Sequence, residues 1–282
     1  MRHRTLNVDG TELFFRDTGP ADAPTVLLLH GFPTSSHMFR RLASRLSDEY
    51  RCVAPDLPGF GYTQSPPPGE FDYTFDRLAE VIEAFTAELG LDSYALYVFD
   101  FGGPVGMRLA VAHPERVRAL IVQNSNAYTE GLSEQTEPLQ AYWRDRDAGE
   151  EAIRGLLTAD ITKFQYTHGV SDPELLDPAC WTLDQHFLDQ PGRAQAQLDL
   201  FYDYRTNVES YPAWQAYLRE KRPPTLVVWG KNDPFFTVAG AEAYRRDQPD
   251  AEVHLYDTGH FALEDHDAEI AKRIREFLGR HG

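Results

Sequence analysis

The stretch from residue 98 to residue 106 reads VFDFGGPVG, and it decides the fold of this chain. It closes an unbroken apolar run, Tyr94 to Phe99, and small residues follow where a helix should begin. A strand that turns sharply into a helix lifts the side chain at the turn, here Asp100, above the edge of the sheet. The free N–H groups and the dipole of the helix N-terminus would keep that carboxylate ionised. Taken alone, an aspartate here is equally compatible with an ordinary turn or a helix N-cap.

Similar apolar runs recur along the chain and predict a sheet. They cover residues 26–29, 52–54, 119–122, 225–229 and 253–256. Continuous apolar strands are buried on both faces, as in parallel sheets. Amphipathic stripes lie between the runs, most clearly at 78–89 and 270–277, and a hairpin around Asp9-Gly10 precedes them. This alternation predicts an α/β fold with a doubly wound, mostly parallel sheet.

The segment from about residue 127 to residue 217 interrupts the alternation. It has no convincing buried strand, and it is rich in aromatic residues, with short helical stripes separated by glycine and proline. We predict a helical cap here, inserted after the sixth strand and lying over the carboxyl edge of the sheet, where open α/β sheets bind ligands. The predicted domains are a core of residues 1–126 and 218–282 and a cap of residues 127–217 over an apolar pocket. A packing subdomain without contact to any site is the alternative.

The composition argues against several classes of partner and cofactor. The 282 residues include 27 basic and 44 acidic side chains, a net charge of -17, so no basic face for nucleic acid or anionic membrane is expected. Cys52 and Cys180 are too few for a disulfide framework or a thiolate metal site, and the histidines at 254, 260 and 266 do not indicate a metal either. The glycines at 102, 103 and 106 do not match the dinucleotide fingerprint. Without a signal peptide or membrane span, we expect a soluble, cytoplasmic protein that uses no metal or cofactor.

Two further polar residues follow late predicted strands. Asp233 lies in a turn after the run at 225–229, and His260 follows the last run, at 253–256. The chain order is therefore Asp100, Asp233, His260, which is the order nucleophile, acid, histidine. Each residue alone could be an ordinary loop residue. Their joint appearance at strand ends, in this order, predicts one catalytic group.

A turn with a glycine, His30-Gly31-Phe32-Pro33, follows the first central strand. A turn at this place can point a backbone N–H into the site. The N–H of Phe32 would then supply half of an oxyanion hole, and the N–H of Phe101, next to the nucleophile, would supply the other half. Alone, a His-Gly pair is a weak signal.

Taken together, these motifs resemble the α/β-hydrolases with an aspartate nucleophile, a group that contains epoxide hydrolases and haloalkane and haloacetate dehalogenases. The resemblance rests on His30-Gly31-Phe32-Pro33, Asp56-Leu57-Pro58-Gly59-Phe60-Gly61, Asp100-Phe101-Gly102-Gly103, Asp233-Pro234 and Gly259-His260-Phe261. It implies that Asp100 forms an alkyl ester with the substrate and that His260, oriented by Asp233, activates the water that hydrolyses it. The Phe32 and Phe101 N–H groups would hold the oxyanion.

The resemblance does not decide whether the leaving group is an epoxide oxygen or a halide. Epoxide hydrolases protonate the leaving oxygen with two cap tyrosines, for which Tyr204 and either Tyr142 or Tyr166 are candidates. Haloalkane dehalogenases often hold the halide with Trp and Asn, but this chain has Phe101 and Phe32 at those places, and neither side chain donates. We therefore predict epoxide hydrolysis to a diol, with dehalogenation of an alkyl halide or haloacid as the alternative. A non-enzymatic receptor is a third reading, against which the complete Asp-His-Asp set argues.

The predicted pocket is aromatic. Its predicted lining residues are Phe32, Phe101, Trp143, Tyr166, Trp181 and Phe261. The expected partners are a small apolar organic substrate and water, and the sequence is compatible with a monomer or a homodimer. Any one cap aromatic could instead be a packing residue.

Overall fold

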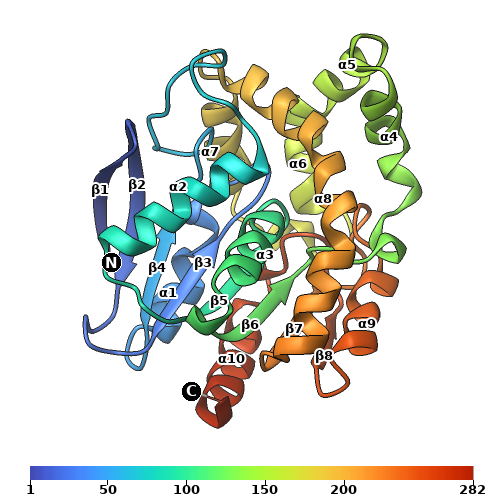
Figure 1. Cartoon of the computed structure of the whole chain (residues 1–282). Helices are drawn as coiled ribbons and strands as arrows, with labels where there is room; N and C mark the ends of the chain where they lie inside the picture. Colours follow the sequence, from blue (N-terminus) through green and yellow to red (C-terminus); the bar gives the residue numbers. More distant parts are fainter. Residues whose placement is uncertain (282) are drawn as a thin grey trace.

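A single sheet with helices on both faces organises the molecule (Figure 1). The computed structural model describes residues 1–281, and in this range the sheet has eight strands in the order β1-β2-β4-β3-β5-β6-β7-β8. The strands are β1 (Arg2–Val8), β2 (Thr11–Thr18), β3 (Thr25–Leu29), β4 (Arg51–Pro55), β5 (Tyr94–Phe99), β6 (Val117–Gln123), β7 (Thr225–Gly230) and β8 (Glu252–Tyr256). The β1–β2 and β2–β4 pairs are antiparallel and all other pairs are parallel, so the predicted α/β sheet is confirmed.

Helices cover both faces of this sheet because successive strand residues point to opposite sides. Leu27 and Leu29 of β3 pack into the cluster that includes α2 and α3, whereas Val26 and Leu28 pack into the cluster with α1 and α10. The helices of the sheet layers are α1 (Arg40–Leu46), α2 (Phe75–Glu88), α3 (Gly102–Ala112), α9 (Val238–Asp247) and α10 (Asp267–His281). No helix within residues 1–281 combines the length and the apolar character needed to cross a membrane.

Between β6 and β7 the chain is helical, as predicted, and these helices gather at one end of the sheet (Figure 1). They are α4 (Glu137–Arg144), α5 (Arg146–Arg154), α6 (Ala159–Thr167), α7 (Ala179–Leu188) and α8 (Arg193–Lys221). Short 3-10 turns connect the elements at Ser36–Phe39, Pro114–Arg116, Thr129–Gly131, Glu134–Thr136, Gly155–Leu157, Pro173–Leu175 and Ala262–Glu264. We refer to α4–α8 as the cap helices.

Helix α8 differs from the short helical stripes that the sequence indicates. It runs unbroken for 29 residues, with Pro212 inside it, and it ends at Lys221, beyond the predicted domain boundary at residue 217. Proline removes one backbone hydrogen bond and normally breaks a helix. Here the neighbouring Tyr211 and Trp214 are buried, so packing against the core outweighs the lost bond. In Figure 1, α8 runs from the cap down beside α3.

The turn between β5 and α3 depends on close backbone approach. Asp100 has a φ of +47°, a left-handed conformation that is rare outside glycine. A Cβ on Gly102 would lie 2.2 Å from the carbonyl oxygen of Leu29 in β3, and one on Gly106 would lie 2.4 Å from a methyl group of Val98. The small residues after Asp100 therefore let α3 start directly against the sheet.

We predict that Gly102→Ala destabilises the protein. The new methyl group would meet backbone that cannot move aside, and overpacking of this kind should lower the free energy of unfolding by about 2 kcal/mol or more. Gly279→Ala is the matched control, because Gly279 lies in α10 with no atom within 4 Å of the new Cβ. Urea unfolding of both variants tests this, and equal stabilities would contradict the packing argument.

Candidate active site

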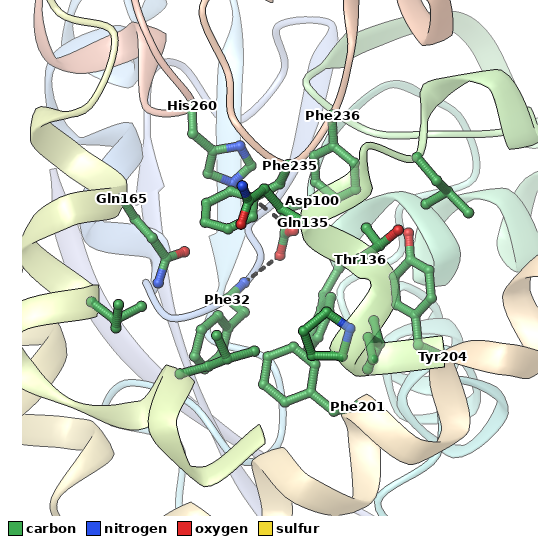
Figure 2. A pocket seen from close by; sticks show the side chains of 16 residues that line it. Phe32, Asp100, Gln135, Thr136, Gln165, Phe201, Tyr204, Phe235, Phe236 and His260 are labelled. Carbon is green, nitrogen blue, oxygen red and sulfur yellow. Dashed lines mark hydrogen bonds and ion pairs between the residues drawn. The ribbon is translucent and has the colours of Figure 1, made fainter. Parts of the chain in front are cut away.

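The carboxylate of Asp100 is held by the backbone on one of its two oxygens. The N–H of Phe32 donates to Asp100 Oδ1 at 2.6 Å, drawn as a dashed line in Figure 2, and the N–H of Phe101 also hydrogen-bonds to this carboxylate. Gly31 makes this approach possible, because a Cβ there would lie 2.2 Å from Asp100 Oδ1. The two N–H groups that the sequence assigned to an oxyanion hole thus converge on Asp100.

Asp100 is a buried acid with an altered proton affinity. Only 7% of the residue is exposed, and burial raises its pKa to about 6, although His260 and the Phe32 and Phe101 N–H groups act in the opposite direction. A raised pKa in a cavity is typical of a functional acid. At neutral pH the carboxylate is ionised and desolvated, which favours its reaction as a nucleophile.

His260 lies between two carboxylates. Its Nδ1 is 2.6 Å from Asp233 Oδ2, and its Nε2 is 3.9 Å from Asp100 Oδ2, the oxygen that does not face Phe32. Burial by itself lowers the pKa of His260, but the charge and hydrogen bond of Asp233, with the charge of Asp100, outweigh burial and raise it. The structure therefore brings together the three residues predicted from their chain order.

Three donors besides His260 fix the carboxylate of Asp233. Its Oδ1 accepts the backbone N–H groups of Phe235 at 2.8 Å and Phe236 at 3.1 Å, and its Oδ2 accepts Nδ2 of Asn124 at 2.7 Å. Asn124, the residue after β6, also accepts the N–H of Gly230 through its Oδ1 at 2.9 Å. Asn124 was not predicted from the sequence. Its signal was a polar residue directly after a buried strand, the same signal that identified Asp100.

A small cavity of about 90 Å³ opens beside Asp100 and His260 (Figure 2). Its walls are mostly aromatic and aliphatic, and they come from the sheet edge, the loop after β7 and the cap. The lining residues are Phe32, Asp100, Phe101, Leu132, Gln135, Thr136, Pro138, Leu139, Leu156, Ile161, Gln165, Phe201, Tyr204, Phe235, Phe236 and His260. Pockets for drug-sized ligands are usually about 300 Å³ or more, so this cavity suits a small substrate.

Tyr204 is the predicted cap tyrosine that lines the cavity. Its ring packs beside Phe101, with 5.8 Å between centroids, and stacks parallel to Trp143 at 6.0 Å. Tyr204 is 3% exposed, and burial raises the pKa of its hydroxyl well above the ordinary value. The hydroxyl therefore stays protonated. The neighbouring Tyr211 hydroxyl, with which it forms a hydrogen bond, adds to the upward pKa shift.

The predictions for two adjacent residues of α4, Tyr142 and Trp143, need correction. Tyr142 does not line the cavity, because it points to α8 and its hydroxyl donates to the carbonyl oxygen of Leu198 at 3.3 Å. Trp143 lies behind Tyr204 and does not line the cavity either. Its indole N–H donates to the carbonyl oxygen of Phe201 at 2.8 Å. Both side chains fasten α4 to α8.

Three further pocket predictions need the same correction, since none of these side chains lines the cavity. Tyr166 stacks face to face on Phe261, with 3.8 Å between centroids, and its hydroxyl donates to Asp184. Trp181 is only partly buried and packs beside Tyr166, with Lys163 over its ring. These aromatic residues join the cap to the core beside the cavity. Tyr166 therefore cannot replace Tyr142 as a second donor.

The cap residues that do line the cavity were mostly not predicted. Phe201 lies one turn before Tyr204 on α8, and Ile161 and Gln165 lie one turn apart on α6. Spacing by three or four residues puts such pairs on one helix face, but it does not tell which face meets the cavity. Among residues 1–281, no three His, Cys, Asp or Glu side chains are arranged to hold a metal ion.

Comparisons with known proteins concern the fold and the family of the chain. The sequence profile described as "alpha/beta hydrolase fold" matches residues 24–267. An uncharacterised hydrolase of Saccharomyces cerevisiae is 44% identical over 278 residues, covering 96% of this chain and 95% of the relative. A cis-3-alkyl-4-alkyloxetan-2-one decarboxylase of Shewanella oneidensis is 26% identical, covering 97% and 87%. A haloalkane dehalogenase of Mycolicibacterium paratuberculosis is 28% identical, covering 93% and 86%.

The fold is also seen in solved structures. An epoxide hydrolase from Vigna radiata superimposes with a TM-score of 0.79 at 24% identity, covering 99% of this chain and 98% of the other. At this level of identity the likeness concerns the fold alone.

We predict that Asp100→Asn makes the protein more stable at pH 8 while abolishing turnover. The folded pKa of Asp100, about 6, lies above its ordinary value of 3.8, so the folded state binds this proton more tightly than the unfolded state. Ionisation therefore costs stability as the pH rises through this range. Removing the charge should add up to about 3 kcal/mol, because a tenfold change in proton affinity corresponds to about 1.4 kcal/mol.

The test is urea unfolding of both proteins at pH 4, 6 and 8. The stability difference should be largest at pH 8 and shrink towards pH 4, where the carboxyl of the folded protein is protonated. Asp22→Asn, in an exposed loop, serves as the control for an ordinary aspartate. A difference that is the same at pH 4 and pH 8 would contradict the raised pKa.

Proposed function

The chain belongs to the α/β-hydrolase family, and from that premise we propose that this hydrolase opens small epoxides to diols through an ester of Asp100. The observation that carries the proposal is the composition of the cavity. Its walls are mostly apolar, and they hold Asp100, His260 and the protonated phenol of Tyr204. One oxygen of the Asp100 carboxylate is bonded to the Phe32 N–H and the other is not. The substrate is a small organic molecule, and water is the second reactant.

In the first step Asp100 Oδ2 attacks an epoxide carbon. Oδ1 is engaged by the Phe32 N–H, so Oδ2 is the oxygen free to form the new C–O bond. The carbon–oxygen bond of the ring breaks, and Tyr204 gives its proton to the leaving oxygen. The products of this step are a hydroxyalkyl ester and the phenolate of Tyr204.

In the second step water cleaves that ester. His260 takes a proton from water, and the resulting hydroxide attacks Cγ of Asp100. Negative charge then develops on Oδ1, which already accepts the Phe32 N–H, and the Phe101 N–H also bonds to this carboxylate, so this stabilisation requires no rearrangement. The intermediate collapses and the departing alkoxide takes the proton from His260. The proton left on Asp100 returns to Tyr204, which restores the enzyme.

Asp233 serves the second step by holding His260. The 2.6 Å contact at Nδ1 keeps Nε2 directed at Asp100 and stabilises the imidazolium that forms. Asn124 and two backbone N–H groups occupy the remaining acceptor positions of Asp233, so this carboxylate stays oriented.

Ring strain explains how one tyrosine suffices. An epoxide releases strain on opening, so its oxygen leaves with less help than an unstrained alkoxide would need. The Shewanella relative is named for an oxetan-2-one, another strained oxygen ring. Thr136, the other hydroxyl of the cavity, donates to the carbonyl oxygen of Ser133 at 2.6 Å and is occupied.

Dehalogenation of a small alkyl halide is the second candidate, favoured by the haloalkane dehalogenase relative. The same attack by Asp100 would expel halide, which needs hydrogen-bond donors but no proton. The cavity lining includes no indole N–H, and the indole of Trp143 is already bonded. It also includes no Arg or Lys to bind a carboxylate, which argues against haloacids. A receptor function would leave the arrangement of Asp100, His260 and Asp233 without a use.

The two cysteines indicate the cellular compartment of the enzyme. Cys52 and Cys180 are both free and buried, as expected for a protein of a reducing compartment. We therefore place the enzyme in the cytoplasm.

We predict that Tyr204→Phe lowers epoxide turnover by about 10²–10⁴-fold, the usual loss for a missing general acid. The ring is kept, so packing against Phe101 and Trp143 should survive. Tyr142→Phe is the matched control, because that hydroxyl bonds to Leu198 outside the cavity, and its turnover should be unchanged.

The measurement is diol formation from butylene oxide, with bromide release from bromobutane run in parallel. Equal losses in the two variants, or full activity in Tyr204→Phe, would remove Tyr204 from the mechanism. Bromide release without any epoxide opening by the unmodified protein would replace the first candidate function with the second.

A further inference from the structure

Gln165 is a polar side chain of the cavity that the proposed chemistry does not use. It lies on α6, is 4% exposed, and lines the cavity with Ile161 one turn before it. Figure 2 shows its carboxamide directed into the cavity, on the other side of Asp100 from Tyr204. Within residues 1–281 the carboxamide has no hydrogen-bond partner, whereas the hydroxyl of Thr136 is occupied. The carboxamide faces the cavity and not the packed interior, so its hydrogen-bonding groups are available to a ligand there.

The position of Gln165 is fixed by the residue that follows it. Tyr166 stacks on Phe261, which follows His260 in the chain, at 3.8 Å between centroids. The hydroxyl of Tyr166 donates to Asp184 and lies 3.4 Å from the hydroxyl of Thr34. Helix α6 is thereby anchored to the core at this point. The carboxamide is thus presented to the cavity by a rigid support, as in preorganised binding sites.

An unpaired carboxamide discriminates between substrates. Water can solvate Gln165 while the cavity is empty, but a substrate that fills this small cavity expels it. A purely alkyl substrate then leaves a buried donor and acceptor unsatisfied, whereas a substrate with a hydroxyl or carbonyl group restores the hydrogen bonds. Ile161 and Leu156 of the same walls are apolar, and the carboxamide of Gln135, from the segment before α4, is the other amide of the lining.

We propose that Gln165 is a specificity-determining residue that selects small, neutral substrates with a hydroxyl or carbonyl group next to the reacting carbon. This inference rests on the proposed epoxide chemistry and narrows its substrate class. Tyr204 serves the leaving oxygen, and Gln165, on the opposite wall, binds the second polar group. The cavity lining lacks cationic side chains, which is why the substrate is expected to be neutral.

Two epoxides of nearly equal shape test the proposal. Glycidol and butylene oxide differ only in a hydroxyl against a methyl group on the carbon beside the ring. The unmodified protein should prefer glycidol in kcat/KM by about tenfold or more, the usual scale for one buried polar group left unpaired. Gln165→Met keeps the length of the side chain and removes its hydrogen bonds, so the preference should disappear, through a higher value for butylene oxide and a lower one for glycidol.

The control is Gln195→Leu, a glutamine of α8 that does not line the cavity, in which the preference should stay. Thermal unfolding should show Gln165→Met to be about as stable as the unmodified protein, because the substitution keeps the length of the side chain and breaks no hydrogen bond within the protein. A preference that is unchanged in Gln165→Met would overturn the proposal. An equal fall in kcat/KM for both epoxides would also overturn it, because Gln165 would then act on the leaving oxygen that both epoxides share.

A second pair separates this proposal from the epoxide function. Bromoethanol and bromopropane have the same hydroxyl-against-methyl difference. If neither epoxide is opened but bromide is released, the epoxide function fails. The ratio of kcat/KM for bromoethanol to that for bromopropane then decides the role of Gln165. Turnover of none of the four compounds would contradict both proposals.

Discussion

The site depends on where the carboxylate of Asp100 is held. The backbone at Asp100 adopts a φ of +47°, and Phe32 N–H donates to Oδ1 at 2.6 Å. Two close approaches make this possible, at Gly31 against the carboxylate and at Gly102 against β3. With one oxygen held by the Phe32 N–H, the other is left facing His260 and the cavity. In the proposed mechanism, this restraint would define which oxygen attacks carbon and where the oxyanion of the second step forms.

Burial removes water from the charged groups of this site, and it lowers the stability of the folded protein when Asp100 is ionised. The raised pKa of Asp100 reflects a carboxylate that has lost most of its water, and the same environment raises the pKa of the Tyr204 hydroxyl. His260 stays basic in an apolar surrounding because Asp233 is beside it. Asp233 in turn is held by Asn124 and two backbone N–H groups. A chain of oriented dipoles thus replaces solvent around the charges that the proposed reaction would create.

The sequence predicted the sheet, and the meeting of Asp100, Asp233 and His260 at one edge of it, because both depend on local signals. Apolar runs mark strands, and polar residues at their carboxyl ends meet at one edge, which located Asp100, Asp233 and His260 and could have located Asn124. The cap was predicted as helical, but its residues were mostly misassigned. Whether a helical aromatic faces the cavity depends on packing between helices, and Tyr142 and Trp143 face α8 instead. The aromatic pattern of the cap does not point to Gln165 either, whose proposed role rests on its place in the cavity.

The most direct test of the ester intermediate is intact-protein mass spectrometry of His260→Gln with butylene oxide. The variant keeps the nucleophile and the oxyanion donors but lacks the base for the second step. We expect the protein to gain the mass of one substrate molecule, and proteolysis should place the addition on the peptide containing Asp100. A folded variant that stays unmodified, with an epoxide that the unmodified protein converts to a diol, would contradict the ester intermediate.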